Sequence, residues 1–410
     1  MPMNLLKLQA LFAKAKSNAR IWGRAHYKET SALVFIGAFF AVGVAFFPTT
    51  YEIRGLITAV SFSGGEAEAQ RVKVTHLPPP DAVKSLYMTS WVAGTPKRRA
   101  ELARLVDETE ANAIVIDVKD YSGRISFDPD NAFLKELGVS NARVPDIREF
   151  LAGLHEKGIY TIARITVFQD PFYAEKRPDL AVQKESDKSL WADYKGLHYL
   201  DPGALEVWDY TVLIGKEAYE AGFDELNFDY IRFPSDGPMN DIYFPWSETR
   251  VVADPNLGKA KVIRDFFAYL HAELAGTGAK LSADLFGMTT TNADDLNIGQ
   301  VLEYAEPYFD YLAPMVYPSH YPTGFIGYAS PVDYPYEVVR YSMDRGVAKL
   351  ATAHANPQKL RPWLQDFDYK ADYGPAEVRA QIQAVYDAGL TSWMLWDPAN
   401  RYTRDALLDK

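Results

Sequence analysis

The sequence contains no cysteine, so no disulfide bond can stabilise the fold. No GxGxxG or GxxxxGK[ST] segment is present, which removes the usual reason to expect a nucleotide-binding sheet. The nucleophile motif GxSxG is also absent, which argues against an esterase of the α/β-hydrolase type. The seven histidines are scattered, without HxH or HExxH spacing. The sequence therefore predicts neither a metal site nor a cofactor.

The 410-residue chain also has no excess of positive charge, because its net charge is -11. Six basic residues and one acidic residue lie within the first 47 positions, so the remainder is more acidic than the whole. Such a body repels phosphate backbones, and a nucleic-acid partner is not expected. Aromatic residues make up 14% of the chain, including 26 tyrosines, which is enough to build a large core.

One long uncharged run stands near the N-terminus, at residues 31–47. A cleaved signal peptide would have a shorter basic region and a small-x-small site directly after the run. A buried core helix would be amphipathic, whereas this segment is apolar on all sides. We predict an uncleaved membrane anchor at residues 31–47, with residues 1–30 as a basic cytoplasmic segment. Residues 48–84 are then a stalk, and residues 85–410 lie outside the cytoplasm, facing the periplasm or the cell surface.

From residue 85 onward, short apolar strands alternate with amphipathic helices. This alternation over about 320 residues predicts a (β/α)8 TIM barrel with long loops at the C-terminal face; a doubly wound open sheet is the alternative. The expected strands are 85–92, 113–119, 160–168, 225–232, 280–286, 311–317, 360–367 and 391–397. The expected helices are 96–110, 145–157, 204–221, 258–275, 295–306, 335–355 and 375–388.

Strand periodicity places polar groups inside the predicted barrel. In segment 280–286, Leu281, Ala283 and Leu285 share one face. If that apolar face packs on helices, Ser282 and Asp284 point inward. Buried charges cost several kcal/mol unless they are paired, and function is one reason to accept that cost. The same argument predicts further inward residues, namely Asp117, Lys119, Arg164 and Asp229.

Eight short segments carry a family resemblance, in order across residues 85–400. They are IDVKDYSG (116–123), ARITVFQDP (163–171), YLDP (199–202), NFDYIRFP (227–234), SADLFG (282–287), MVYPSHY (315–321), RPWLQDF (361–367) and WMLWDPAN (393–400). With these segments the chain resembles the bacterial putative glycosyl hydrolase family of barrel proteins. More remotely, its carboxylates on strands four and five are similar to those of α-amylase-like barrel glycosidases, although Asp284 stands where a glutamate is usual.

Glycoside hydrolysis needs two carboxyl groups across the scissile bond. We hypothesise that Asp229 is the nucleophile and Asp284 the general acid/base. Their adjacent strands favour the short spacing of a retaining enzyme. The alternative is a structural role, in which Asp229 forms a buried ion pair with Arg164 or Arg232.

Further residues are expected to bind substrate or to position the carboxylates. Asp117 is expected to pair with Lys119 or to hold a sugar hydroxyl, and Arg164 to keep the nucleophile ionised. Aromatic side chains near strand ends fit the apolar faces of sugar rings, although packing of the barrel rim explains them equally well. The predicted substrate-binding residues are Asp117, Lys119, Arg164, Trp191, Arg232, Tyr317, Trp363, Gln365 and Trp396.

The sequence thus predicts a membrane-anchored glycoside hydrolase or transglycosidase that acts on a cell-surface or exported polysaccharide. The alternative is a noncatalytic polysaccharide-binding barrel with a role in envelope assembly or export. Two carboxyl groups at one open cleft would favour the enzyme. A single carboxylate held by an arginine would favour the binding protein.

Overall fold

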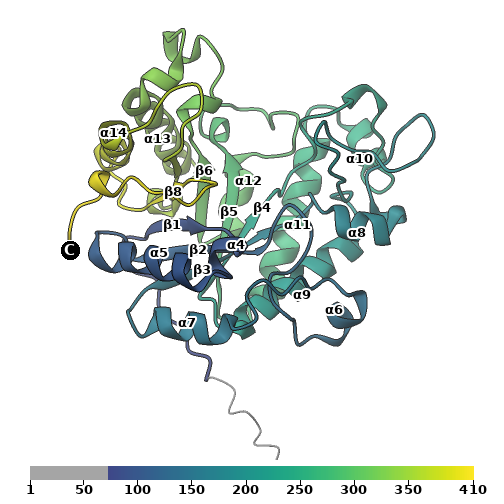
Figure 1. Cartoon of the computed structure of the whole chain (residues 1–410). Helices are drawn as coiled ribbons and strands as arrows, with labels where there is room; N and C mark the ends of the chain where they lie inside the picture. Colours follow the sequence, from purple (N-terminus) through teal and green to yellow (C-terminus); the bar gives the residue numbers. More distant parts are fainter. Residues whose placement is uncertain (1–72) are drawn as a thin grey trace, which may run out of the picture. The chain divides into compact units, whose positions relative to one another are not determined.

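The computed structural model of the protein describes residues 73–410, and the predicted segment 1–30, the anchor 31–47 and most of the stalk lie outside this range. Within residues 73–410, eight parallel strands close into a barrel in chain order (Figure 1). The predicted TIM barrel is confirmed for this part of the chain, and each predicted strand segment overlaps one strand. The strands are β1 (Lys84–Met88), β2 (Ala113–Lys119), β3 (Tyr160–Thr166), β4 (Glu225–Asp229), β5 (Lys280–Phe286), β6 (Tyr311–Met315), β7 (Trp363–Gln365) and β8 (Trp393–Trp396).

Helices surround the barrel and connect its strands (Figure 1). Several begin with proline in the first turn, where no backbone donor is lost, as at Pro96, Pro335 and Pro375. In the described part of the chain, no helix is long and apolar enough to span a bilayer. The α-helices are α4 (Ser90–Ala93), α5 (Pro96–Glu108), α6 (Ala132–Leu137), α7 (Ile147–His155), α8 (Pro171–Lys176), α9 (Leu205–Ala221), α10 (Glu248–Ala253), α11 (Gly258–Leu274), α12 (Leu302–Ala305), α13 (Pro335–Thr352) and α14 (Pro375–Asp387).

The helix predicted at 295–306 is wrong for most of its length. Only α12 forms there, and the residues before it make a loop. Leu296 and Asn297 have φ angles of 54° and 56°, and Gly299 has a φ of 84°. Three left-handed residues within four positions cannot continue a right-handed helix.

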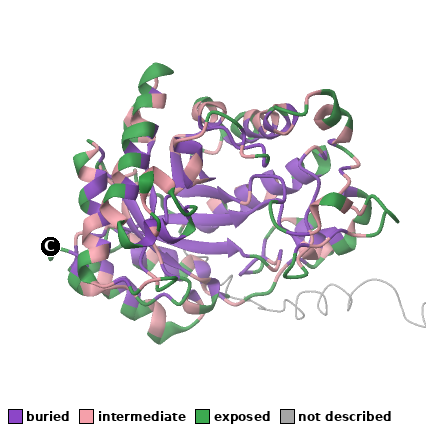
Figure 2. Cartoon of the chain, turned by 90° about the horizontal axis from the view of Figure 1, so that it is seen from above, coloured by how far each residue is buried: buried purple, intermediate pink, exposed green. Residues whose placement is uncertain are grey.

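Apolar side chains fill two separate regions of the described chain. The larger core lies between strands and helices, and Figure 2 shows the strands buried beneath helices whose outer faces are exposed. The smaller cluster lies inside the barrel and includes Tyr87, Tyr160 and Trp363. Alternation along each strand sends successive side chains to these two regions in turn. Polar residues share the barrel interior with the smaller cluster.

A buried ion pair fills the barrel interior at the N-terminal end of β4. Glu225 pairs with Arg361, and both side chains are fully buried. Arg361 Nη1 and the Tyr160 hydroxyl each donate to Glu225 Oε2 at 3.2 Å. This layer lies at the opposite end of β4 from Asp229, so the barrel interior is packed below the predicted site.

Replacing Arg361 with methionine is expected to lower the free energy of unfolding by about 3 kcal/mol, because Glu225 would remain as an unpaired buried charge. Urea unfolding followed by circular dichroism measures this change. The double variant Arg361→Met with Glu225→Gln should recover most of the loss. A single variant as stable as the wild type would show that the pair is not needed.

Candidate active site

Arg164 is the centre of a charged cluster on β2, β3 and β4. Its Nη1 donates to Asp117 Oδ1 at 2.7 Å, and its Nε donates to Asp229 Oδ2 at 3.1 Å. All three side chains are buried, with exposed fractions of 3–6%. Nearby negative charges outweigh burial and hold the pKa of Arg164 well above its usual value. The guanidinium therefore stays charged, while burial outweighs its attraction and raises the pKa of Asp117 above the usual value.

Asp284 on β5 adds a second carboxyl group beside Asp229. Its Oδ2 lies 4.0 Å from Arg164 Nε, the atom that also binds Asp229. Its Oδ1 accepts hydrogen bonds from Asn227 Nδ2 at 2.9 Å and from Trp363 Nε1 at 2.7 Å. Burial, followed by the negative charge of Asp229, raises the pKa of Asp284 to about 8. The two carboxyl groups thus lie together in different electrostatic environments.

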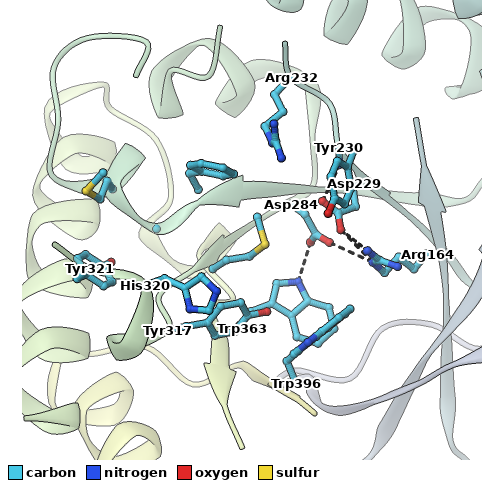
Figure 3. Close-up of a pocket in the computed structure, with 14 residues that line it drawn as sticks. Arg164, Asp229, Tyr230, Arg232, Asp284, Tyr317, His320, Tyr321, Trp363 and Trp396 are labelled. Carbon is cyan, nitrogen blue, oxygen red and sulfur yellow. Dashed lines mark hydrogen bonds and ion pairs between the residues drawn. The ribbon is translucent and has the colours of Figure 1, made fainter. Parts of the chain in front are cut away.

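A cavity of about 390 Å³ is lined by both carboxylates. Figure 3 shows Asp229, Asp284 and Arg164 on one side of it, joined by the ion pairs and hydrogen bonds described above. Trp363 and Trp396 form an aromatic wall with their rings perpendicular, at an interplanar angle of 89°. The lining residues are Arg164, Asp229, Tyr230, Arg232, Asp284, Phe286, Gly287, Met288, Met315, Tyr317, His320, Tyr321, Trp363 and Trp396.

Most of the residues predicted for the site meet at this cavity. Asp117 does not line it, because it lies behind Arg164 and accepts a hydrogen bond from the Tyr87 hydroxyl at 2.6 Å. Asp117 can therefore position Arg164, whereas the predicted residues that line the cavity can contact a ligand. Those that line the cavity are Arg164, Asp229, Arg232, Asp284, Tyr317, Trp363 and Trp396.

The predicted ion pair between Asp117 and Lys119 is wrong. The register between β2 and β3 shifts between these two residues, so that they no longer share a face. Lys119 Nζ instead binds Asp170 Oδ2 and the Thr166 carbonyl oxygen, each at 2.7 Å. Its ammonium group also lies over the ring of Tyr210 on α9. Lys119 therefore points into the helical layer, away from the cavity.

Trp191 and Gln365, which were predicted to bind substrate, also fall outside the cavity lining. Trp191 is fully buried, packs against Gly237 and donates from Nε1 to the Pro238 carbonyl oxygen at 3.2 Å. The buried Gln365 side chain accepts from the Ser319 backbone at 3.2 Å. Both residues hold loops together, because a long loop at the barrel rim needs its own packing and hydrogen bonds.

Several lining residues were not predicted as ligands. Tyr230 has a φ of 52°, which is uncommon for a residue with a side chain, and its backbone N–H donates to Asp229 Oδ1 at 2.6 Å. This turn directly after β4 orients the carboxylate. His320 and Met315 also line the cavity. No sequence pattern predicts the turn at Tyr230. The position of Met315 at the end of its strand, in contrast, could have predicted that it lines the site.

The raised pKa of Asp284 predicts a pH dependence of stability. The folded protein keeps this proton up to about pH 8, whereas an unfolded aspartate releases it near pH ~3.9. Between these values the folded state binds more protons, so the free energy of unfolding falls as pH rises. Urea unfolding at several pH values should show the Asp284→Asn variant gaining stability relative to the wild type from pH ~4 to ~8. Parallel curves for the two proteins would contradict this assignment.

Known proteins resemble the chain in sequence and in fold. A family profile described as "Putative glycosyl hydrolase domain" matches residues 85–402. A hypothetical protein from Ruminiclostridium thermocellum ATCC 27405 is 34% identical, with 48% of this chain and 96% of that one covered and a TM-score of 0.43. The PgaB (BpsB) glycoside hydrolase domain from Bordetella bronchiseptica is 16% identical, with coverage of 80% and 99% and a TM-score of 0.57. No curated protein sequence matches the chain significantly.

Proposed function

This chain belongs to the family described as Putative glycosyl hydrolase domain, and on that basis we propose that it cleaves or transfers glycosidic bonds with a pair of carboxyl groups. The observation that carries the proposal is the meeting of Asp229 and Asp284 at one cavity, both within 4.0 Å of Arg164 Nε. A pair of carboxyl groups in different environments can divide the roles of nucleophile and acid between them.

Asp229 suits the role of nucleophile. Arg164 forms an ion pair with it, and the Tyr230 backbone N–H fixes its orientation. Attack by this carboxylate on the anomeric carbon would break the glycosidic bond and form a glycosyl ester. Water would then hydrolyse the ester, or a sugar hydroxyl would take the glycosyl group in a transfer reaction. Neighbouring strands lie about 4.8 Å apart, which favours the short carboxyl spacing of a retaining enzyme.

Asp284 suits the role of general acid. Its raised pKa keeps the proton in place at neutral pH, ready for the leaving oxygen. After the first step the same group, now ionised, would accept the proton of the incoming water. The hydrogen bonds from Asn227 and Trp363 hold Oδ1, so Oδ2 remains for the leaving oxygen.

The aromatic wall supports a carbohydrate ligand. Trp396 stacks on Tyr87 at 3.8 Å between ring centroids, and the guanidinium of Arg164 lies 5.0 Å from the centroid of Trp396. These contacts hold the indole rigidly at the cavity. Rigid aromatic faces bind the apolar faces of sugar rings with little loss of side-chain entropy.

The second candidate function is a noncatalytic polysaccharide-binding barrel, favoured by the hydrogen bonds that hold Asp229 to Arg164. A panel of polysaccharides incubated with the purified full-length chain separates the two functions, with products analysed by mass spectrometry. Release of shorter glycans that depends on Asp229 and Asp284 would support the enzyme. Glycan binding without any product would favour the binding protein.

The proposed acid role of Asp284 predicts the pH dependence of activity. Because the protonated form is the active one, kcat/KM should fall as pH rises through about 8. The Asp284→Asn variant should lose this alkaline limb together with most of its activity. Initial rates between pH 5 and pH 10, on the glycan that the panel identifies, measure both curves. An unchanged alkaline limb in the variant would assign it to another group.

We also propose that the barrel works outside the cytoplasm on a cell-surface or exported polysaccharide, held by the anchor predicted at residues 31–47. The basic residues before this run and its lack of charge support that orientation. Fractionation of cells that express the full-length chain tests the proposal. Full-length protein in the membrane fraction, with its barrel accessible to external protease, is expected, and full-length protein in the soluble cytosol would contradict it.

A further inference from the structure

Arg232 is a buried cation at the cavity, and no carboxylate of the described part of the chain pairs with it. Its exposed fraction is 8%, and within residues 73–410 it forms no ion pair. Its Nη1 donates to the Phe233 carbonyl oxygen and to Ser235 Oγ, each at 3.1 Å. The buried guanidinium groups of Arg164 and Arg361, in contrast, both bind carboxylates. A buried charge without a counterion is costly, so an outside partner would stabilise Arg232.

The guanidinium of Arg232 is held in a fixed position beside the cavity. It lies 4.9 Å from the ring centroid of Tyr230 and 4.8 Å from that of Phe286. These ring contacts and the two hydrogen bonds of Nη1 fix the planar group. Figure 3 shows Arg232 across the cavity from Trp396, with its guanidinium directed toward the space above Asp284. Nε and Nη2 make no hydrogen bond within the described chain, so both can donate to a ligand.

We propose that Arg232 binds an anionic group on the sugar that enters this cavity, which makes the substrate an acidic glycan. The proposal rests on the function proposed above for the same cavity. The planar fork of a guanidinium matches a carboxylate, as in a uronic acid, and it also accepts a sulfate ester. A neutral or cationic sugar would leave Arg232 buried without a counterion.

The net charge of -11 does not prevent an acidic ligand from binding. At physiological ionic strength, charges separated by more than ~8 Å are largely screened, so distant surface acids act weakly. Beside the cavity, Arg164 pairs with both Asp117 and Asp229, burial raises the pKa of Asp117, and Asp284 holds its proton at neutral pH. Arg232 therefore sets the charge that a ligand meets on its side of the cavity.

Matched pairs of glycans test this proposal by binding alone. The probes are polygalacturonate, alginate and hyaluronan, each beside its carboxyl-reduced form, and dextran sulfate beside dextran. Calorimetry with the full-length chain should show an acidic member bound about 10- to 100-fold more tightly than its neutral counterpart, as expected for one charge-assisted pair. The pair with the larger ratio of affinities identifies the anionic group. That group is a carboxylate for the first three pairs and a sulfate ester for dextran sulfate.

Three variants show whether Arg232 causes the preference. Arg232→Gln should remove it, and Arg232→Lys should keep part of it, because the charge remains while the fork is lost. The matched control is Arg345→Gln on α13, an exposed arginine whose guanidinium lies 5.8 Å from the ring centroid of Tyr341. This control should bind like the wild type.

Equal binding of acidic and neutral members, binding of neutral glycans alone, or binding of none of the probes would overturn the proposal. A preference that survives in Arg232→Gln would overturn it as well. The Asp284→Asn variant separates this result from the proposed function, because it should lose turnover and keep the preference. A preference that depends on Arg232 without any product would sustain the acidic ligand and reject catalysis. Equal cleavage of acidic and neutral glycans would support catalysis and reject the acidic ligand.

Discussion

Replacement of Asp229 with asparagine is expected to lower kcat/KM by about 10³-fold or more while the barrel stays folded. Asparagine has nearly the same shape but cannot attack the anomeric carbon as a carboxylate does. Arg164 keeps its ion pair with Asp117 in this variant, so the loss of one charge should be tolerated. Kinetics on the glycan found in the panel measure the activity, and circular dichroism confirms the fold.

A matched control for this substitution is Asp310→Asn. Asp310 lies just before β6, at the opposite end of the barrel, where it accepts hydrogen bonds from Lys280 and from the Leu281 backbone. The Asp310→Asn variant should have the same activity as the wild type. Wild-type turnover by Asp229→Asn would end the assignment of the nucleophile.

The Asp284→Asn variant should behave differently from Asp229→Asn on activated substrates. An aryl glycoside with a good leaving group needs no proton in the first step, so removal of the acid matters less there. Loss of the nucleophile affects natural and activated glycosides alike. The ratio of the two activities therefore separates the roles of the two carboxyl groups.

Replacing Arg164 with methionine is expected to lower the free energy of unfolding by about 5 kcal/mol, at the upper end of what the loss of a buried pair costs. The guanidinium binds Asp117 and Asp229 together, and its removal leaves two buried carboxylates facing each other. Chemical unfolding, or the temperature midpoint for a protein of low yield, measures the change.

Two further variants keep this prediction testable if Arg164→Met fails to fold. Arg164→Lys retains the charge without the fork and should lose about 2 kcal/mol. Adding Asp117→Asn and Asp229→Asn to the methionine variant should restore stability, because no charge is then left unpaired. A methionine variant that loses less than about 1 kcal/mol would show that Arg164 does not hold the cluster together.

The fold and the centre of the site could be predicted because both follow from strand periodicity. In a closed parallel barrel, side chains alternate strictly between the interior and the helices. The inward placement of Arg164, Asp229 and Asp284 follows from that rule alone, and all three line the cavity. Lys119 breaks the rule, because a single irregularity between β2 and β3 sends it to the other side of its strand.

The rest of the site depends on loops, which have no such periodicity. Trp191 and Gln365 looked like ligands by residue type, yet Trp191 packs within its own loop and Gln365, at the end of β7, binds the backbone of the loop after β6. His320 follows β6 and lines the cavity through the path of that loop. The positive φ of Tyr230 depends on the surrounding structure, because nothing in its own side chain favours this conformation. These features can be identified only from the three-dimensional structure.

Trapping of the covalent intermediate tests the central claim most directly. A 2-deoxy-2-fluoro analogue of the cleaved glycan slows hydrolysis of the glycosyl ester, and peptide mass spectrometry then locates the attached sugar. Our account predicts one glycosyl group on Asp229 in the wild type and none in Asp229→Asn. A sugar attached to another residue, or turnover with inversion of the anomeric carbon, would contradict it.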